Sequence, residues 1–211
     1  MIHPPARPCV PARGYGAAPK PARDLPMRSA LWLALAVLGL AIPRGASAAP
    51  PAGYEDPHVL RIESSPGQAI TTYTPEQIKA GFPMRVIETG TPWSEAGEKI
   101  KYRGPDLKEV LAKSGLGDAA SIEVFAYDDF ITTIHMDEIS EYQPILAIER
   151  GCTAGDRKTG RCAEGQDYRA LDLADSGPYS IIWPLDQLPK AYTAGRNAIW
   201  VWFVVALRPG P

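Results

Sequence analysis

Short apolar stretches separated by turn-forming residues recur along the chain beyond residue 58 and predict β-strands. Residues 60–63 alternate apolar and polar side chains, which is the period-two pattern of a half-buried strand. Ser65-Pro66-Gly67 ends that strand as a turn. Residues 198–207 form a ten-residue apolar run, which is too short to cross a membrane as a helix and is typical of a strand buried on both faces. Similar patterns predict strands at residues 84–88, 97–103, 121–127, 130–135, 144–148 and 179–183.

Two short helices are predicted between these strands. Residues 74–77 read Thr-Pro-Glu-Gln, which is a capping box with proline at the first helical position. Asp106 and Glu109 have capping spacing before a stretch whose apolar side chains share one face, and Gly115 ends that helix. Many short strands with two short helices indicate an α+β, mainly β domain.

Residues 27–48 have the pattern of a secretory signal peptide. Arg28 supplies a positive charge, residues 30–42 are thirteen residues without charge, and Ala46-Ser47-Ala48 is a small-x-small cleavage site. The uncharged run is shorter than the roughly 20 residues that a membrane-spanning helix needs. We therefore expect a periplasmic or secreted protein, in which residues 49–211 form one globular domain without a membrane span.

The first 26 residues are rich in proline and poor in large apolar side chains. Such a composition buries too little surface to offset the entropy of the chain, so residues 1–26 are expected to be disordered. A simple hypothesis is that translation begins at Met27 and that the preceding segment comes from an over-long gene model.

Cleavage after Ala48 changes the charge of the chain. Sixteen basic and 23 acidic residues remain, which gives a net charge of −7. This balance disfavours nucleic acid and anionic membrane surfaces as partners.

Two cysteines remain after Ala48 and are expected to bond to each other. Cys152 and Cys162 are an even pair in a compartment where disulfides persist. Nine residues separate them, which is neither zinc-knuckle spacing nor a Cys-x-x-Cys redox pair. They lie within residues 150–170, whose glycines and charges predict an inserted surface loop.

Several short motifs, in order along the mature chain, resemble the molybdopterin-binding domain of the sulfite oxidase family, in particular its small, single-domain exported members. The resemblance covers roughly residues 58–207 and depends on the order and spacing of motifs that are individually degenerate. The motifs are Thr91-Pro92-Trp93, Tyr102-Arg103-Gly104-Pro105-Asp106-Leu107, Ala126-Tyr127-Asp128-Asp129-Phe130, Ile145-Leu146-Ala147, Gly177-Pro178, Ile181-Ile182-Trp183-Pro184 and Trp200-Val201-Trp202.

The resemblance implies a mainly β, α+β fold in which loops on one side of the sheets surround molybdopterin and its metal. It also implies a cysteine thiolate on molybdenum, from the loop after the strand at residues 84–88. Here that loop reads Thr89-Gly90-Thr91-Pro92-Trp93 and contains no cysteine. A hydroxyl group is a poor substitute for a thiolate on a soft, redox-active metal.

Five residues are candidates for contact with a pterin: Thr89, Thr91, Trp93, Arg103 and Arg150. In one interpretation Trp93 covers the flat ring while the two arginines hold its phosphate through forked hydrogen bonds. In the other, Trp93 is part of the core and the arginines are solvated strand ends.

The neighbouring acids Asp128 and Asp129 are expected to form a turn, because on an extended chain their carboxylates point to opposite faces. They are therefore not expected to act together as a general acid and base.

Three functional hypotheses follow. The leading one is a non-catalytic ligand-binding or sensing module that lacks the molybdenum-ligating cysteine. The second is an active molybdopterin-dependent oxidoreductase in which the metal takes a different ligand. The third is an accessory subunit that uses the fold to dock a partner protein.

Overall fold

The computed structural model describes residues 53–95 and 97–211 of the 211-residue chain. The predicted leader (1–26), the signal peptide (27–48) and the expected cleavage site lie outside these residues. No helix in the described part of the chain is long and apolar enough to span a membrane.

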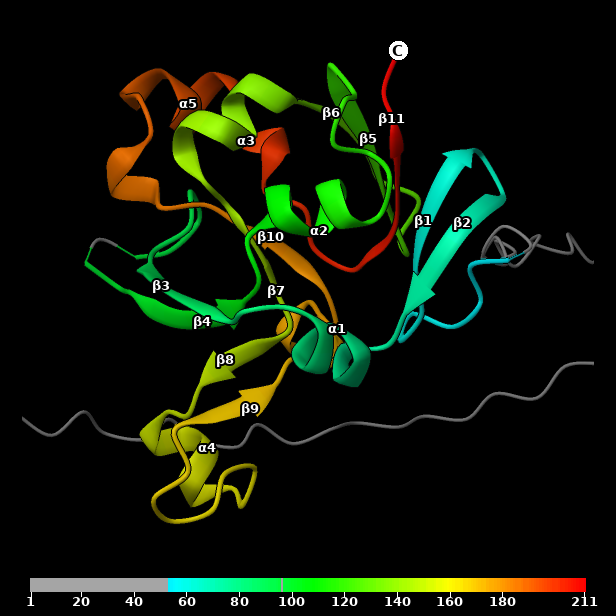
Figure 1. The fold of residues 1–211 in the computed structure, drawn as a ribbon. Helices are drawn as coiled ribbons and strands as arrows, with labels where there is room; N and C mark the ends of the chain where they lie inside the picture. Colours follow the sequence, from blue (N-terminus) through cyan, green and yellow to red (C-terminus); the bar gives the residue numbers. More distant parts are fainter. Residues whose placement is uncertain (1–52, 96) are drawn as a thin grey trace, which may run out of the picture. The chain divides into compact units, whose positions relative to one another are not determined.

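The largest sheet has five strands in the order β2-β1-β11-β5-β6. Strand β11 lies between β1, to which it is parallel, and β5, to which it is antiparallel (Figure 1). The hairpins β1–β2 and β5–β6 are antiparallel and flank it. The bounds of these strands are β1 Leu60–Ser65, β2 Gln68–Tyr73, β5 Ser121–Ala126, β6 Ile131–His135 and β11 Val204–Pro209.

A four-stranded antiparallel sheet and a two-stranded ladder complete the β structure of the described residues. The four strands have the order β3-β4-β8-β9, and β7 pairs with β10. Their bounds are β3 Arg85–Thr89, β4 Ile100–Gly104, β7 Ile145–Ala147, β8 Glu149–Gly151, β9 Tyr168–Ala170 and β10 Ser180–Ile182. These strands confirm the mainly β, α+β prediction.

Helix α1 (Pro75–Gly81) confirms the predicted capping box. The Gln77 N–H donates to Thr74 Oγ1, and the Thr74 N–H donates to the Gln77 side chain. Helix α2 (Leu107–Lys113) buries Leu107, Val110 and Leu111, as its apolar face predicts, although the Asp106 side chain makes no cap hydrogen bond.

Five α-helices occur in the described residues, where two were expected. Helices α4 and α5 have five and six residues, so neither completes the two turns over which a 3.6-residue period can be recognised. The additional helices are α3 Met136–Tyr142, α4 Ala154–Lys158 and α5 Lys190–Gly195, with short 3₁₀ turns η1 Leu173–Asp175, η2 Leu185–Gln187 and η3 Asn197–Ile199.

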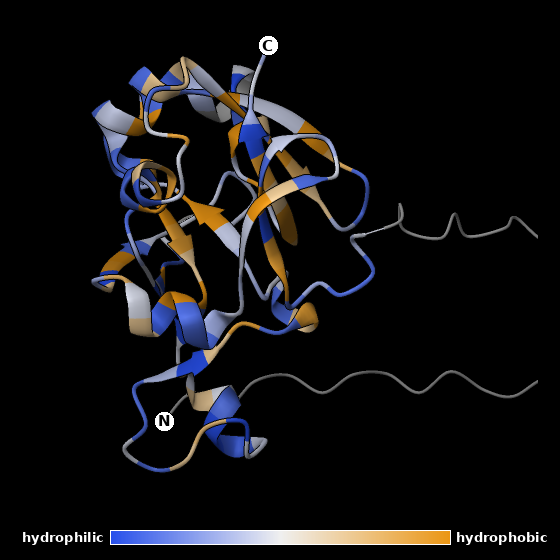
Figure 2. Ribbon diagram, turned by 45° about the vertical axis from the view of Figure 1, so that its right-hand side comes forward, coloured by the Kyte–Doolittle hydropathy of each residue, from blue (hydrophilic) through white to orange (hydrophobic). Residues whose placement is uncertain are grey.

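The core is formed around β7 and β10, whose residues are all buried. Trp183 and Tyr179 flank β10 and are its largest fully buried neighbours. The Trp183 indole N–H donates to the Ile199 carbonyl at 2.9 Å, and the Tyr179 hydroxyl donates to the Tyr73 carbonyl at 2.7 Å. Figure 2 shows the inner strands as mostly hydrophobic, in agreement with their burial.

The prediction of one continuous strand over residues 198–207 is wrong in part. The first residues belong to η3, Val201 forms an isolated bridge with Ile181, and only β11 continues as a strand. Phe203 has a φ of 54°, a left-handed conformation that interrupts an extended chain. Residues 204–207 are buried, as predicted for this part of the run.

The prediction of an inserted surface loop at residues 150–170 is right about the exposed position of the segment but wrong in that the segment also forms helix and strand. The segment contains most of β8, all of α4 and β9, and it projects away from the other strands as the α4 lobe (residues 149–170; Figure 1). The predicted disulfide is confirmed, because Cys152 and Cys162 are bonded within the lobe with their Cα atoms 6.1 Å apart.

Candidate functional site

An aromatic groove of about 290 Å³ is the site with the most distinctive chemistry in the described residues. Three indoles and a phenyl ring line it, together with one carboxylate and one amide. These side chains come from the β3–β4 connection, the β5–β6 turn and the segment from η3 to β11. They are Trp93, Trp200, Trp202, Phe130, Asp128 and Asn197.

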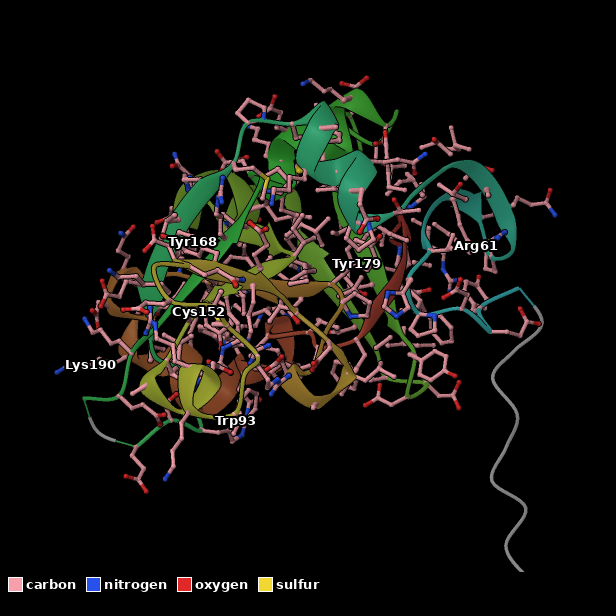
Figure 3. The ribbon with its side chains drawn as sticks, turned by 90° about the horizontal axis from the view of Figure 1, so that it is seen from below. Arg61, Trp93, Cys152, Tyr168, Tyr179 and Lys190 are labelled. Atoms are coloured by element: carbon pink, nitrogen blue, oxygen red, sulfur yellow. A yellow bond between two sulfur atoms is a disulfide. The ribbon has the colours of Figure 1, made fainter. Side chains whose placement is uncertain are left out.

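Trp93 is held at the groove by a turn of hydroxyl hydrogen bonds in the β3–β4 connection. The Thr91 N–H donates to Ser94 Oγ at 2.9 Å, and the Trp93 N–H donates to Thr91 Oγ1 at 3.3 Å. The Trp93 side chain is 58% exposed, and Figure 3 labels it near the edge of the molecule. The interpretation of Trp93 as a core residue is therefore wrong.

Trp200 and Trp202 form the inner wall of the groove. Successive side chains of an extended segment point to opposite faces, so both indoles lie opposite Val201, whose backbone bridges Ile181. Trp200 is buried, whereas Trp202 is partly exposed and stands next to Trp93, with their ring centroids 6.3 Å apart.

The β5–β6 turn supplies the remaining aromatic ring and the carboxylate. Asp128 Oδ1 accepts a hydrogen bond from the Phe130 N–H at 3.3 Å, and Asp129 has a φ of 66°. These features confirm the predicted turn. They also place the Phe130 ring, which is 41% exposed, and the Asp128 carboxylate at the rim of the groove.

The two arginines expected at a cofactor phosphate do not line this groove. Arg103 lies 3.2 Å from Glu149 Oε2 and stacks on the Tyr168 ring at 5.2 Å from its centroid. Arg150 pairs with Asp175 at 3.0 Å. Both guanidinium groups are partly buried and engaged by carboxylates, so neither is a solvated strand end. Their contact with a cofactor stays a prediction.

The two threonines use their hydroxyl groups within the protein. Thr89 is buried at the end of β3, where its Oγ1 donates to the Gly90 carbonyl and accepts from the Leu185 N–H at 3.0 Å. Thr91 Oγ1 accepts from the Trp93 N–H, as described above, and lies 3.1 Å from Ser94 Oγ. These hydroxyls shape the β3–β4 connection.

The residues present do not fit a molybdenum centre with a protein thiolate. Both cysteines of the described chain are bonded to each other in the α4 lobe. Among residues 53–95 and 97–211, no group of three or more His, Cys, Asp or Glu side chains is placed to hold a metal ion. A step through thiolate-bound molybdenum therefore has no basis in residues 53–95 and 97–211.

Comparison with known proteins gives only weak similarity, and only to solved structures. No family model matches the chain, and no curated protein matches it. Among solved structures, the sulfane dehydrogenase SoxCD from Paracoccus pantotrophus is similar, with 15% sequence identity and a TM-score of 0.43. The similarity covers 74% of this chain and 38% of that chain. At this level it assigns no family, activity or residue role to this chain.

Sequence reasoning missed most of the groove. It treated Trp200 and Trp202 as parts of a terminal strand and did not select Phe130 or Asn197. The available signal was the Trp-Val-Trp alternation, since period two places both indoles on one face.

A cluster of paired charged side chains anchors the α4 lobe. Arg169 of β9 is buried and pairs with Asp156 of α4 at 2.8 Å and with Asp175 of η1. Asp175 also accepts from Arg150 at 3.0 Å and from Arg161 at 3.1 Å. Every charged group of this cluster has a partner of opposite sign, so its evident role is structural.

The acidic members of this cluster have low pKa values. Hydrogen bonds from Thr153, and then from Arg169, lower the pKa of Asp156 to about 2. Burial opposes the ionisation of Asp175, but hydrogen bonds from Arg169 and Asp172 outweigh it and hold the pKa of that carboxyl well below its usual range.

Acid is therefore expected to destabilise the protein. A carboxyl with a lowered folded-state pKa stabilises fully above its unfolded-state pKa of roughly 4, and this contribution is lost as pH falls towards the folded-state value. For Asp156 the loss extends from about pH 5 to about pH 2. Urea unfolding at a series of pH values measures the slope of the free energy of unfolding against pH. Asp156→Asn should flatten it, and an unchanged slope in that variant would contradict this assignment.

Proposed function

We propose that this chain is an exported, non-catalytic module that binds a small ligand in the aromatic groove. The observation that carries the proposal is Trp93, whose large indole is 58% exposed and stands beside Trp202 at the mouth of a groove. Exposed aromatic surface in a concave site with few polar groups is typical of ligand-binding sites. Export rests on the signal pattern of residues 27–48.

The non-catalytic part of the proposal rests on the chemistry of the groove. Its polar side chains are one carboxylate and one amide, Asp128 and Asn197. The described cysteines are both used in the disulfide, far along the chain from the β3–β4 connection. Indole faces can stack on a ligand and make apolar contacts with it, which supports binding but supplies no group for covalent or acid–base catalysis.

Neutral pterin is a suitable first probe, because its flat ring can stack on Trp93. We expect saturable binding to the mature chain, observed through quenching of pterin fluorescence. Trp93→Ala should weaken binding by roughly 5- to 150-fold, the range expected for loss of one base-like stacking contact. Val86→Ala removes an exposed apolar side chain of β3 that does not line the groove, and it should leave the affinity unchanged.

The proposal fails if pterin and a panel of small aromatic and ammonium compounds all leave the tryptophan fluorescence unchanged. It also fails if binding persists unchanged in both Trp93→Ala and Trp202→Ala, because the ligand would then occupy another place.

A further inference from the structure

The charged groups around the aromatic groove are mainly negative. Asp128 lines it, and Asp129 and Glu95 each lie within two residues of a lining side chain. None of these three acids forms an ion pair with another residue in the part of the chain that the structure describes. No lysine or arginine among the described residues lines the groove.

Arg196 directly precedes Asn197, which lines the groove, but its charge is already balanced by an ion pair. Its guanidinium donates to both oxygens of Glu138, at 2.8 and 2.6 Å, and to the Thr133 carbonyl at 3.2 Å. The buried Glu138 therefore holds Arg196 against β6 and α3. An anionic ligand in the groove would meet Asp128 with no free guanidinium to balance it.

The aromatic rings favour the same sign of ligand charge. The face of an indole is electrostatically negative and attracts cations within about 6 Å of the ring centroid. Trp93 and Trp202 are inclined at 57° and Trp200 and Trp202 at 40°, so no pair is stacked face to face. Trp93 is exposed and Trp202 partly exposed, whereas Trp200 is buried, so the first two indoles are the ones open to a ligand, and one carboxylate lines the same groove.

We infer that the groove selects ligands whose bound part is an organic cation with an apolar shell, of the quaternary or methylated ammonium class. The inference rests on the proposed function of the same groove and adds the charge of its ligand. Tryptophan faces contact the methyl groups and attract the charge spread over them. Asp128 supplies the compensating negative charge, and Asn197 offers an amide to a polar substituent of the ligand.

Choline and 3,3-dimethylbutan-1-ol test this inference as a matched pair, because they have the same shape and differ in charge. Titration calorimetry on the mature chain should give choline the higher affinity by roughly 5- to 30-fold, the range for a desolvated cation on aromatic faces. Asp128→Asn should reduce that ratio, whereas Asp118→Asn, at an exposed position outside the groove, changes net charge equally and should not.

The outcomes separate the two proposals. Equal affinity for the two compounds, or an unchanged ratio in Asp128→Asn, would overturn the cation preference and leave the ligand-binding groove intact. Choline binding that survives Trp202→Ala without loss would place the cation elsewhere and also overturn the inference. If pterin, choline and the alcohol all fail to bind, the proposed function fails together with it.

Discussion

Trp183→Ala is expected to lower the free energy of unfolding by about 3–5 kcal/mol, the usual range for removing a large aromatic side chain from a core. Trp183 is fully buried after β10, and its indole N–H satisfies the Ile199 carbonyl of η3. The variant therefore loses packing and also leaves a buried carbonyl without its donor. Urea unfolding of wild type and variant measures the change.

Trp183→Phe separates these two contributions. Phenylalanine keeps an aromatic ring in the core but cannot donate to the Ile199 carbonyl, so this variant should lose less stability than Trp183→Ala. A loss equal to that of the alanine variant would assign most of the effect to the hydrogen bond. No loss in either variant would contradict the central position of Trp183 in the core.

Arg169→Met should also cost about 3–5 kcal/mol, because removing one partner of a buried ionic cluster leaves the Asp156 carboxylate buried without its guanidinium partner and takes one of three partners from Asp175. Arg169 is only 7% exposed and joins Asp156 to Asp175. Methionine keeps an unbranched stem that matches arginine as far as Nε and removes the charged guanidinium group, so the loss of stability reports mainly the loss of charge. Chemical denaturation with the disulfide intact provides the measurement.

The exposed pair Lys99–Asp186 is the matched control for Arg169. Lys99 Nζ and Asp186 Oδ2 lie 2.6 Å apart, but the two side chains are 45% and 72% exposed. Surface ion pairs of this kind contribute little to the free energy of unfolding. Lys99→Met should leave the unfolding midpoint nearly unchanged. Equal destabilisation by Lys99→Met and Arg169→Met would argue against a special role for the buried cluster.

Local signals in the sequence were sufficient for several elements. The capping box at residues 74–77 depends on side chains three positions apart, so it could be recognised without the rest of the fold. The Cys152–Cys162 bond could be predicted because these two cysteines form an even pair after the predicted signal peptide, and an exported protein would favour their oxidation. In contrast, β8 and β9 have three residues each, which is too few for an alternation to stand out from a loop.

The groove could not be predicted in the same way, because three segments distant in sequence form it. Nothing near Trp93 indicates that it faces Trp202, more than one hundred residues later. The ion pair of Arg150 could not be predicted either, since its carboxylate partner Asp175 comes from η1, 25 residues later in the sequence. Phosphate binding was a reasonable expectation for an arginine whose partner could not be seen in the sequence.

The position of β11 has a consequence for the order of events in folding. A chain leaves the ribosome amino end first, so the hairpins β1–β2 and β5–β6 emerge well before β11, which is the last element along the sequence. These hairpins share no ladder with each other, and β11 alone joins them in the five-stranded sheet. The five-stranded sheet is therefore complete only when β11 has paired with both hairpins, so its assembly depends on contacts between residues far apart in sequence.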